Sequence, residues 1–206
     1  MKTADTATHK LTPKGRATRE RIVAAAAALT YERGVAGTST EEVREAAGVS
    51  ASQLYHYFDS KQALIRAVIA RQSDAVLAAQ QPYLGQLDSL DALRAWRDHI
   101  VARRRQRDRQ GGCPLGTLSC ELAGTWSEAR ADLLGSFGRW EGALRRGLWA
   151  MRDRGELRAD ADPDSLALAL LAAVQGGLLL NRVRQDTAAL EAALDATLAH
   201  IASLAP

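Results

Sequence analysis

Residues 38–61 have the sequence TSTEEVREAAGVSASQLYHYFDSK, and this stretch decides the fold of the N-terminal part of the chain. Gly48 separates two short segments and is expected to end the first of them, because helices often end at a glycine. Thr40 and Ser50 stand where a helix N-cap is wanted, since their hydroxyls can accept from the free backbone N–H groups of a first turn. The stretch therefore predicts two short helices joined by a tight turn, a helix-turn-helix over 39–58.

The second of these helices has an outward face suited to DNA. Leu54 and Phe58 are four residues apart and are expected to face inward, so that the intervening side chains point outward. In a helix-turn-helix the second helix enters the major groove, where amides, hydroxyls and methyl groups can contact base edges. Hydroxyls and cations near it can bind phosphates. The candidate DNA-contacting residues are Thr40, Ser50, Ala51, Ser52, Gln53, Tyr55, His56, Tyr57 and Lys61. The alternative is a plain helical hairpin with a partly aromatic surface.

The rest of the chain shows apolar residues at helical spacing and no strand pattern, which predicts an all-α protein of about nine helices. We expect a disordered basic arm over 1–15, a helix-turn-helix DNA-binding domain over 16–76, and a second helical domain over 82–206. The clustered cations of the arm are typical of a segment that binds polyanions.

Composition favours a cytoplasmic protein. The chain has 206 residues, a formal net charge of +3 and only 2 cysteines, which do not make a disulfide framework. Its N-terminus is polar and lacks the apolar core of a signal peptide. The longest apolar run, residues 166–180, is short for a membrane span and is interrupted at Gln175. A protein that binds DNA in this compartment is expected to associate with the nucleoid.

The stretch from Arg19 to about Val68 resembles the DNA-binding domain of the TetR family of transcriptional regulators. The matching pieces are RIVAAA at 21–26, YERG at 31–34, TST at 38–40, AAGVS at 46–50 and LYHYF at 54–58, followed by Lys61 and Leu64. The resemblance implies a homodimer, one DNA-binding head per subunit, and a C-terminal domain that binds a small molecule. It also implies repression that is relieved by the small molecule, although activation stays open. Glu41 and Glu42 depart from relatives that place a base-reading cation there, so specificity is expected to depend more on DNA shape.

The stretch GGCPLG at 111–116, followed by Leu118 and Glu121, resembles the LmrA/YxaF-like subgroup of the family. That resemblance implies a pocket for a largely apolar effector. Pockets are usually apolar with a few polar anchors. The candidate effector-binding residues are Trp96, His99, Cys113, Leu118, Trp126, Phe137, Trp140, Leu144 and Gln175. The alternative is that these aromatic residues only fill the core.

Cys113 precedes Pro114 at an expected helix start, where the helix dipole lowers a thiol pKa. A regulator that senses electrophiles or oxidants through Cys113 is therefore a second hypothesis. The alternative is that Cys113 and Cys120 are both small buried apolar residues, with Cys120 the more purely packed of the two.

The last two helices are expected to form a dimer seam, because the helix from Pro163 is apolar nearly all round and must bury more than one face. The candidate interface residues are Leu166, Leu170, Val174, Leu178, Leu190, Leu194, Leu198 and Ile201. The alternative is an internal core helix. A two-fold dimer would present two heads to a near-palindromic operator.

Other classes of protein fit less well. The four histidines are scattered without ligand spacing, and no phosphate loop or nucleophile motif is present, so we expect no catalytic residue, metal or cofactor. An architectural DNA-binding protein without an effector would have a tightly filled C-terminal domain.

Overall fold

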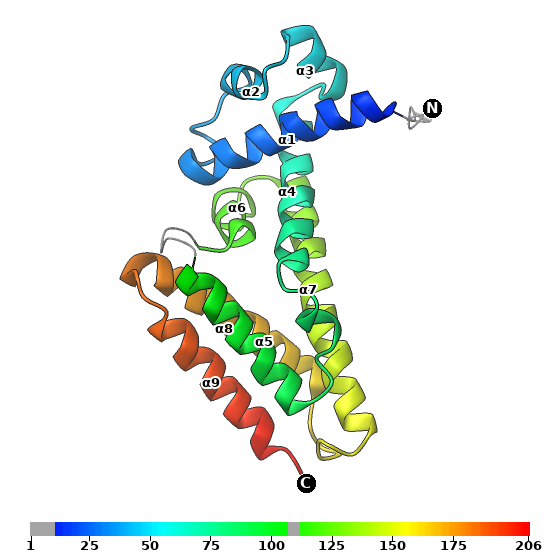
Figure 1. The fold of residues 1–206 in the computed structure, drawn as a ribbon, viewed down its shortest axis with the longest axis vertical. Helices are drawn as coiled ribbons and strands as arrows, with labels where there is room; N and C mark the ends of the chain where they lie inside the picture. The colour runs from blue at the N-terminus through cyan, green and yellow to red at the C-terminus, as the bar shows by residue number, and fades with distance from the viewer. Residues whose placement is uncertain (1–10, 107–111) are drawn as a thin grey trace. The chain divides into compact units, whose positions relative to one another are not determined.

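The computed structural model describes residues 11–106 and 112–206, and their regular structure is entirely helical (Figure 1). The helices are α1 (Pro13–Arg33), α2 (Thr40–Ala47), α3 (Ala51–Tyr57), α4 (Lys61–Ala78), the 3₁₀ turn η1 (Tyr83–Gly85), α5 (Leu90–Gln106), α6 (Pro114–Leu122), α7 (Ser127–Asp153), α8 (Pro163–Arg184) and α9 (Ala188–Ser203). The predicted all-α class with about nine helices is confirmed. The first ten residues of the expected basic arm lie outside the described residues.

The chain divides into two compact units, and the division falls inside α4, between Val68 and Ile69. In the N-terminal unit, α1 packs against α2, and α2 contacts α3. Its core is apolar: Ile22 of α1, Val43 of α2 and Leu54 of α3 are all buried. The three helices that precede α4 therefore share one small core, which holds α3 in place.

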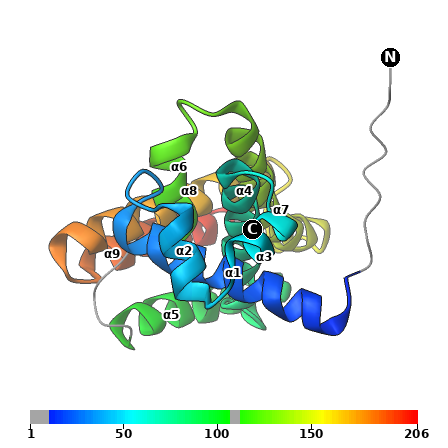
Figure 2. The same ribbon diagram turned by 90° about the horizontal axis from the view of Figure 1, so that it is seen from above.

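In the C-terminal unit α8 is the central helix. It packs along α9 and against α7, and α5 also contacts α9 (Figures 1 and 2). Gly177 lies where α8 and α9 come closest, because a Cβ added there would be 2.6 Å from the Leu190 Cα. Only glycine allows the two backbones to approach this far, which fixes the crossing point of the pair.

Several helix boundaries follow their local signals. Ser50 caps α3 as predicted, and Asp162 caps α8, with Pro163 at the first helical position. Gly48 ends α2 with φ of +61°, a conformation in which a side chain would be strained. These ends need only their own few residues, and so the sequence was sufficient to place them.

One predicted cap was assigned to the wrong residue. Ser39, not Thr40, caps α2, because Ser39 has extended backbone angles and its hydroxyl accepts from the Glu42 N–H at 3.2 Å. Thr40 is already the first helical residue. At the start of α7, the residue in the cap position is Trp126, and no side chain caps that helix. The hydroxyl of Ser127 bonds to Glu128 instead.

Candidate DNA-binding face and effector cavity

Two capping boxes shape the α2–α3 hairpin. Ser39 and Glu42 bond reciprocally at the start of α2, and Ser50 and Gln53 do the same at the start of α3. Each box satisfies two backbone or side-chain donors that would otherwise need water. The hairpin is therefore held by local hydrogen bonds as well as by its core residue Leu54.

The outward face of α3 is as expected. Leu54 and Phe58 are 2% and 3% exposed, whereas Tyr55 is 56% exposed. The other candidate residues of this helix divide as follows: Ala51, Ser52, Gln53 and His56 are exposed, as is Ser50, and Tyr57 is half-buried. Of the two flanking candidates, Thr40 and Lys61 border the same small hollow of the N-terminal unit. The structure thus brings most of the candidate residues to the surface of one short helix.

Four of the candidate residues are already engaged in hydrogen bonds. The Gln53 side-chain oxygen accepts from the Ser50 N–H at 2.9 Å, so bidentate pairing of Gln53 with adenine would require opening the capping box. The Ser52 and Ser50 hydroxyls share a hydrogen bond of 2.9 Å. The Lys61 ammonium donates to the Val35 carbonyl at 2.8 Å. Fewer groups are therefore free for base reading than the sequence suggests.

The N-terminal turn of α1 adds cations beside α3. The Tyr57 hydroxyl lies 3.4 Å from the position of a Cβ built on Gly15, and the Arg19 guanidinium lies 5.0 Å from the centre of the Phe58 ring. Lys14 and Arg16 are exposed in the same turn. The candidate list omitted these cations, although the basic run at the N-terminus was a signal for them.

The two glutamates at the start of α2 form ion pairs with arginines of the same unit. Hydrogen bonds from Ser39 lower the pKa of Glu42, which also pairs with Arg33 at 3.1 Å. A hydrogen bond from Arg44 lowers the pKa of Glu41. Both carboxylates are therefore charged at neutral pH, but each has a cationic neighbour that reduces its repulsion of a phosphate.

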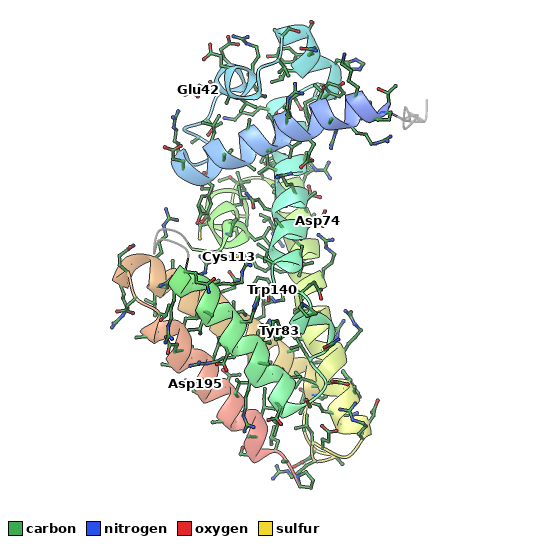
Figure 3. The ribbon with its side chains drawn as sticks, viewed as in Figure 1. Glu42, Asp74, Tyr83, Cys113, Trp140 and Asp195 are labelled. Atoms are coloured by element: carbon green, nitrogen blue, oxygen red, sulfur yellow. The ribbon has the colours of Figure 1, made fainter. Side chains whose placement is uncertain are left out.

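The C-terminal unit contains a cavity of about 220 Å³. Its wall is formed by α4 and the turn after it, α5, the start of α6, α7 and α8, with Val76, Ile100, Cys113, Trp140, Val174 and Leu178 among the lining residues. Figure 3 labels Cys113 and Trp140 among these helices. Two of the nine candidate effector-binding residues, Cys113 and Trp140, therefore line the cavity.

The tryptophans of the cavity region differ in their hydrogen bonding. Trp96 is fully buried behind the wall, and its indole N–H donates to the Gln80 Oε1 at 3.0 Å. Trp140 is 2% exposed, and its indole nitrogen has no hydrogen-bond partner within the described parts of the chain. The side-chain nitrogen of Gln175 is likewise buried without a hydrogen-bond partner there, and its side-chain oxygen lies 3.1 Å from the position of a Cβ built on Gly116 of α6.

The remaining effector candidates do not line the cavity. Leu118 and Leu144 are buried core residues. Trp126 and Phe137 are half-buried. His99 bonds to the Ala79 carbonyl at 2.9 Å and lies against the Tyr83 ring, with 4.7 Å between centroids. Sequence spacing could not distinguish a cavity wall from the layer behind it.

Cys113 is buried, as the packing alternative expects, whereas Cys120 is not. Burial raises the pKa of the Cys113 thiol, and this effect exceeds the opposing hydrogen bonds and the charge of Arg104. Burial thus opposes the effect of the helix start, because desolvation disfavours the charged form of the thiol. Cys120, expected to be the more purely packed of the two, is exposed.

The candidate dimer residues lie inside the subunit. Leu166, Leu170, Val174, Leu178, Leu190, Leu194, Leu198 and Ile201 are all buried in the single chain. They pack within the C-terminal unit and offer no surface to a partner. The outward side of α8 carries a different apolar stripe, formed by Leu168, Leu179, Leu180 and Val183, each at least 48% exposed.

Two further features of the described residues bear on function. No group of three or more His, Cys, Asp or Glu side chains able to hold a metal ion occurs within 11–106 and 112–206. One helix there, α8, is long and apolar enough to cross a membrane. Its packing against α7 and α9 is that of a core helix.

Comparisons with known proteins agree with this architecture. A family model described as bacterial regulatory proteins, tetR family, matches residues 22–68, and one described as the tetracyclin repressor-like C-terminal domain matches residues 89–197. An HTH-type transcriptional regulator in the lacX 3′ region of Lactococcus lactis is 32% identical, covering 87% of this chain and 91% of its own length. The HTH-type transcriptional repressor DhaR of Mycobacterium sp. (strain GP1) is 26% identical, covering 82% of this chain and 84% of its own.

A solved structure shows the same fold over nearly the whole chain. It is that of a TetR transcriptional regulator from Chloroflexus aurantiacus, with a TM-score of 0.81 and 27% identity. The match covers 94% of this chain and 98% of that one. Both units of the chain therefore have counterparts in one known regulator.

Proposed function

The chain belongs to the TetR family of bacterial transcriptional regulators, and from this premise we propose that it is a repressor that releases its operator when a small molecule enters the C-terminal cavity. The observation that carries the proposal is the cavity itself. Residues Gln72 to Gln80, in α4 and the turn after it, supply part of its wall, and the N-terminal half of α4 belongs to the DNA-binding unit. One helix therefore takes part in both units.

The mechanism is a shift between two conformations. A ligand that binds one arrangement of α4 more tightly than the other favours that arrangement by its difference in binding free energy, typically about 1–3 kcal/mol. If the distance between the two heads of a dimer no longer matches the half-site spacing in the favoured arrangement, the DNA is released. The similarity to DhaR, itself a repressor, supports repression over activation.

On the DNA, the exposed residues of α3 are proposed to enter the major groove. Tyr55 and His56 are exposed, Gln53 retains its side-chain N–H₂ group, and the exposed Ser52 hydroxyl shares its hydrogen bond with Ser50. Phosphate contacts are proposed for Thr40, Tyr57 and the α1 cations Lys14 and Arg16. Cations bound to phosphates release counterions, so the affinity is expected to fall steeply with salt.

TetR-family regulators form dimers, and we place the interface of this chain on the outward stripe of α8. Leu179 is 59% exposed and Val183 is 74% exposed, which is unusual for residues of a soluble protein unless another surface covers them. Leu179→Glu should convert a dimer of the 22.2 kDa chain into monomers. Leu134→Glu is the matched control, because Leu134 on α7 is 71% exposed and lies outside the stripe. Light scattering after gel filtration distinguishes these outcomes, and equal masses for both variants would contradict this interface.

The repressor proposal is tested by filling the cavity. Val76 lines it from α4, whereas Ala78, on the same helix, is exposed and does not. Val76→Phe should bind the DNA upstream of the chain's own gene as tightly as wild type but lose the response to any compound that releases the wild type. Ala78→Phe should keep both properties. Release that is unchanged in Val76→Phe would contradict an effector site in this cavity.

Thiol sensing through Cys113 stays as the second hypothesis, and burial of the thiol weighs against it. Cys113→Ser separates the two hypotheses, because a substituted protein that still releases DNA with the same compound does not use the thiol as its switch. An architectural protein without an effector would have a filled C-terminal unit, and the cavity of about 220 Å³ weighs against that.

A further inference from the structure

The side-chain amide of Gln53 is held in one orientation by the capping box at the start of α3. Its Oε1 accepts from the Ser50 N–H at 2.9 Å, while the backbone N–H of Gln53 donates to the Ser50 Oγ at 3.1 Å. A backbone N–H can only donate, so the oxygen of the amide, and not its nitrogen, must face Ser50. Gln53 is exposed, and its side-chain nitrogen is the end of the amide that is left for a partner outside the chain.

The capping box of α2 shows that the second end of such a side chain can reach beyond the box. There the Oε2 of Glu42 accepts from the Ser39 N–H at 2.8 Å, and its Oε1 accepts from the Arg33 guanidinium at 3.1 Å. Gln53 occupies the same position in the box of α3 that Glu42 occupies in the box of α2. The Gln53 nitrogen corresponds to the Glu42 Oε1 and carries N–H donors in place of an acceptor. The box of α3 thus presents a donor group outward.

A group that can only donate distinguishes the bases by the polarity of their major-groove edges. Guanine presents the acceptors N7 and O6, and thymine presents the acceptor O4, whereas cytosine presents the N4 amino donor. Adenine presents the acceptor N7 beside the N6 amino donor, and a glutamine pairs with it through both ends of the amide. To pair in this way Gln53 would have to open the box and lose its bond to Ser50. Its orientation therefore favours guanine or thymine.

The outward neighbours of Gln53 on α3 carry groups whose polarity is not fixed. The hydroxyls of Ser52 and Tyr55 can each donate or accept. In the bond of 2.9 Å between the hydroxyls of Ser50 and Ser52, either oxygen can be the donor. The His56 ring nitrogens donate or accept according to the tautomer. Ser52, Tyr55 and His56 can therefore adapt to a keto or an amino base, whereas Gln53 cannot do so without breaking its box.

We propose that Gln53 is a specificity-determining residue whose side-chain nitrogen donates to the O6 of guanine or the O4 of thymine at one position of each half-site. Every base pair has one such keto base and one amino base, so the contact also determines which strand carries the keto base. This inference rests on the proposed function, in which α3 enters the major groove of an operator, and it names the class of base that one residue of α3 reads.

Gln53→Glu tests the inference because it changes the outward group and keeps the box. A glutamate at this position can accept from the Ser50 N–H, as Glu42 accepts from Ser39, and it presents its second oxygen where the amide nitrogen was. An acceptor in that place favours the amino donors of cytosine and adenine. The preference at one position of the half-site should therefore change from guanine or thymine to cytosine or adenine.

Bound sequences are selected from a random DNA library with the full-length wild type and with Gln53→Glu at one salt concentration. Operators with each of the bases at the position that changes are then compared by fluorescence anisotropy. One hydrogen bond to a base should make wild type bind the keto bases about three- to tenfold more tightly per half-site, and Gln53→Glu should reverse this order. The added negative charge weakens binding to all these operators alike, so it does not alter the ratio between them.

Gln53→Ala is a second variant in case Gln53→Glu does not bind DNA. It retains the bond from the backbone N–H of residue 53 to the Ser50 Oγ, but its side chain has neither a donor nor an acceptor. It should lose the base preference at one position where wild type selects guanine or thymine. A purely structural role of Gln53 in the box would not change the order of the bases in either variant.

The outcomes separate this inference from the proposed function. Selection of adenine or cytosine by wild type at the position where the variants differ would overturn the inference and leave the repressor intact. Base preferences that are the same in wild type and in the variants that bind DNA would do the same. No enriched sequence with wild type would overturn the proposed function and this inference with it.

Discussion

The two buried tryptophans of the C-terminal unit provide a matched experiment on the cavity. Trp96→Phe and Trp140→Phe both replace an indole by a smaller ring in a buried position, so the loss of apolar contact is similar in kind. The two sites differ in the indole N–H. Trp96 donates to Gln80 at 3.0 Å, whereas Trp140 Nε1 has no partner in the described structure.

This difference in hydrogen bonding determines how far each substitution lowers the free energy of unfolding. In Trp96→Phe the buried Gln80 oxygen loses its donor, which costs about 1–3 kcal/mol. In Trp140→Phe an unpaired buried donor is removed, which offsets part of the packing loss by a similar amount, about 1–3 kcal/mol. Trp96→Phe should therefore be less stable than Trp140→Phe by about 2 kcal/mol or more.

The assay is urea unfolding of both variants and wild type at one protein concentration, because the stability of a dimer depends on concentration. Trp140→Phe should also bind the effector less tightly, whereas Trp96→Phe, if folded, should retain affinity. Equal destabilisation of the two variants, or a larger loss in Trp140→Phe, would refute the assignment of the Trp140 indole N–H as an unsatisfied buried donor.

Three further predictions concern the fold. Ser39→Ala should destabilise the N-terminal unit by about 1 kcal/mol in thermal unfolding, because it removes a cap, and Thr40→Ala should cost less; the reverse order would restore Thr40 as the cap. Gly177→Ala should lower the stability by about 1–3 kcal/mol, because its Cβ would meet the Leu190 backbone, whereas Gly138→Ala has open space and should be neutral or stabilising; a stable Gly177→Ala would contradict the close crossing. The pKa of the Glu191 carboxyl is lowered, first by the Thr187 hydroxyl, so the charged carboxylate stabilises the fold above the unfolded pKa, and this stabilisation is lost as the pH falls through the lower folded value. Below about pH 4.5 wild type should therefore lose stability relative to Glu191→Gln, by at most about 1 kcal/mol. Parallel pH profiles of the free energy of unfolding would contradict this.

Local features of the sequence predicted the fold well. The cap of α3 at Ser50 and the start of α8 at Asp162-Pro163 depend on residues within one turn, so their chemistry alone identifies them. The same approach misplaced the cap of α2 by one residue. Ser39 and Thr40 both carry hydroxyls, and the choice between them depends on which backbone is extended.

Features that depend on distant packing were harder to predict. The leucines of α8 and α9 have the periodicity of a buried face, but periodicity does not say whether the same chain or a partner covers that face. The structure shows that α8 and α9 bury these residues against each other within the chain, and the outward stripe with Leu179 was not singled out. The cavity was hard to predict for the same reason, because residues from α4, α5, α7 and α8 meet only in the folded unit.

The hypothesis of a lowered thiol pKa at Cys113 is weakened for a related reason. A helix start lowers a thiol pKa when the thiol remains solvated, whereas this thiol is buried and desolvation dominates. The sequence contained the helix start and Pro114, but burial depends on the packing of α6 against the rest of the unit.

The central claim is that the chain is an effector-responsive operator-binding protein, and selection of bound sequences from a random DNA library tests it most directly. The account predicts enrichment of a near-palindrome with half-sites about one helical turn apart, bound with an affinity that falls steeply with salt. Adding a compound that is shown to occupy the C-terminal cavity should abolish this binding. No enriched sequence, or an enriched sequence whose binding is unaffected by a ligand shown to occupy the cavity, would contradict the account.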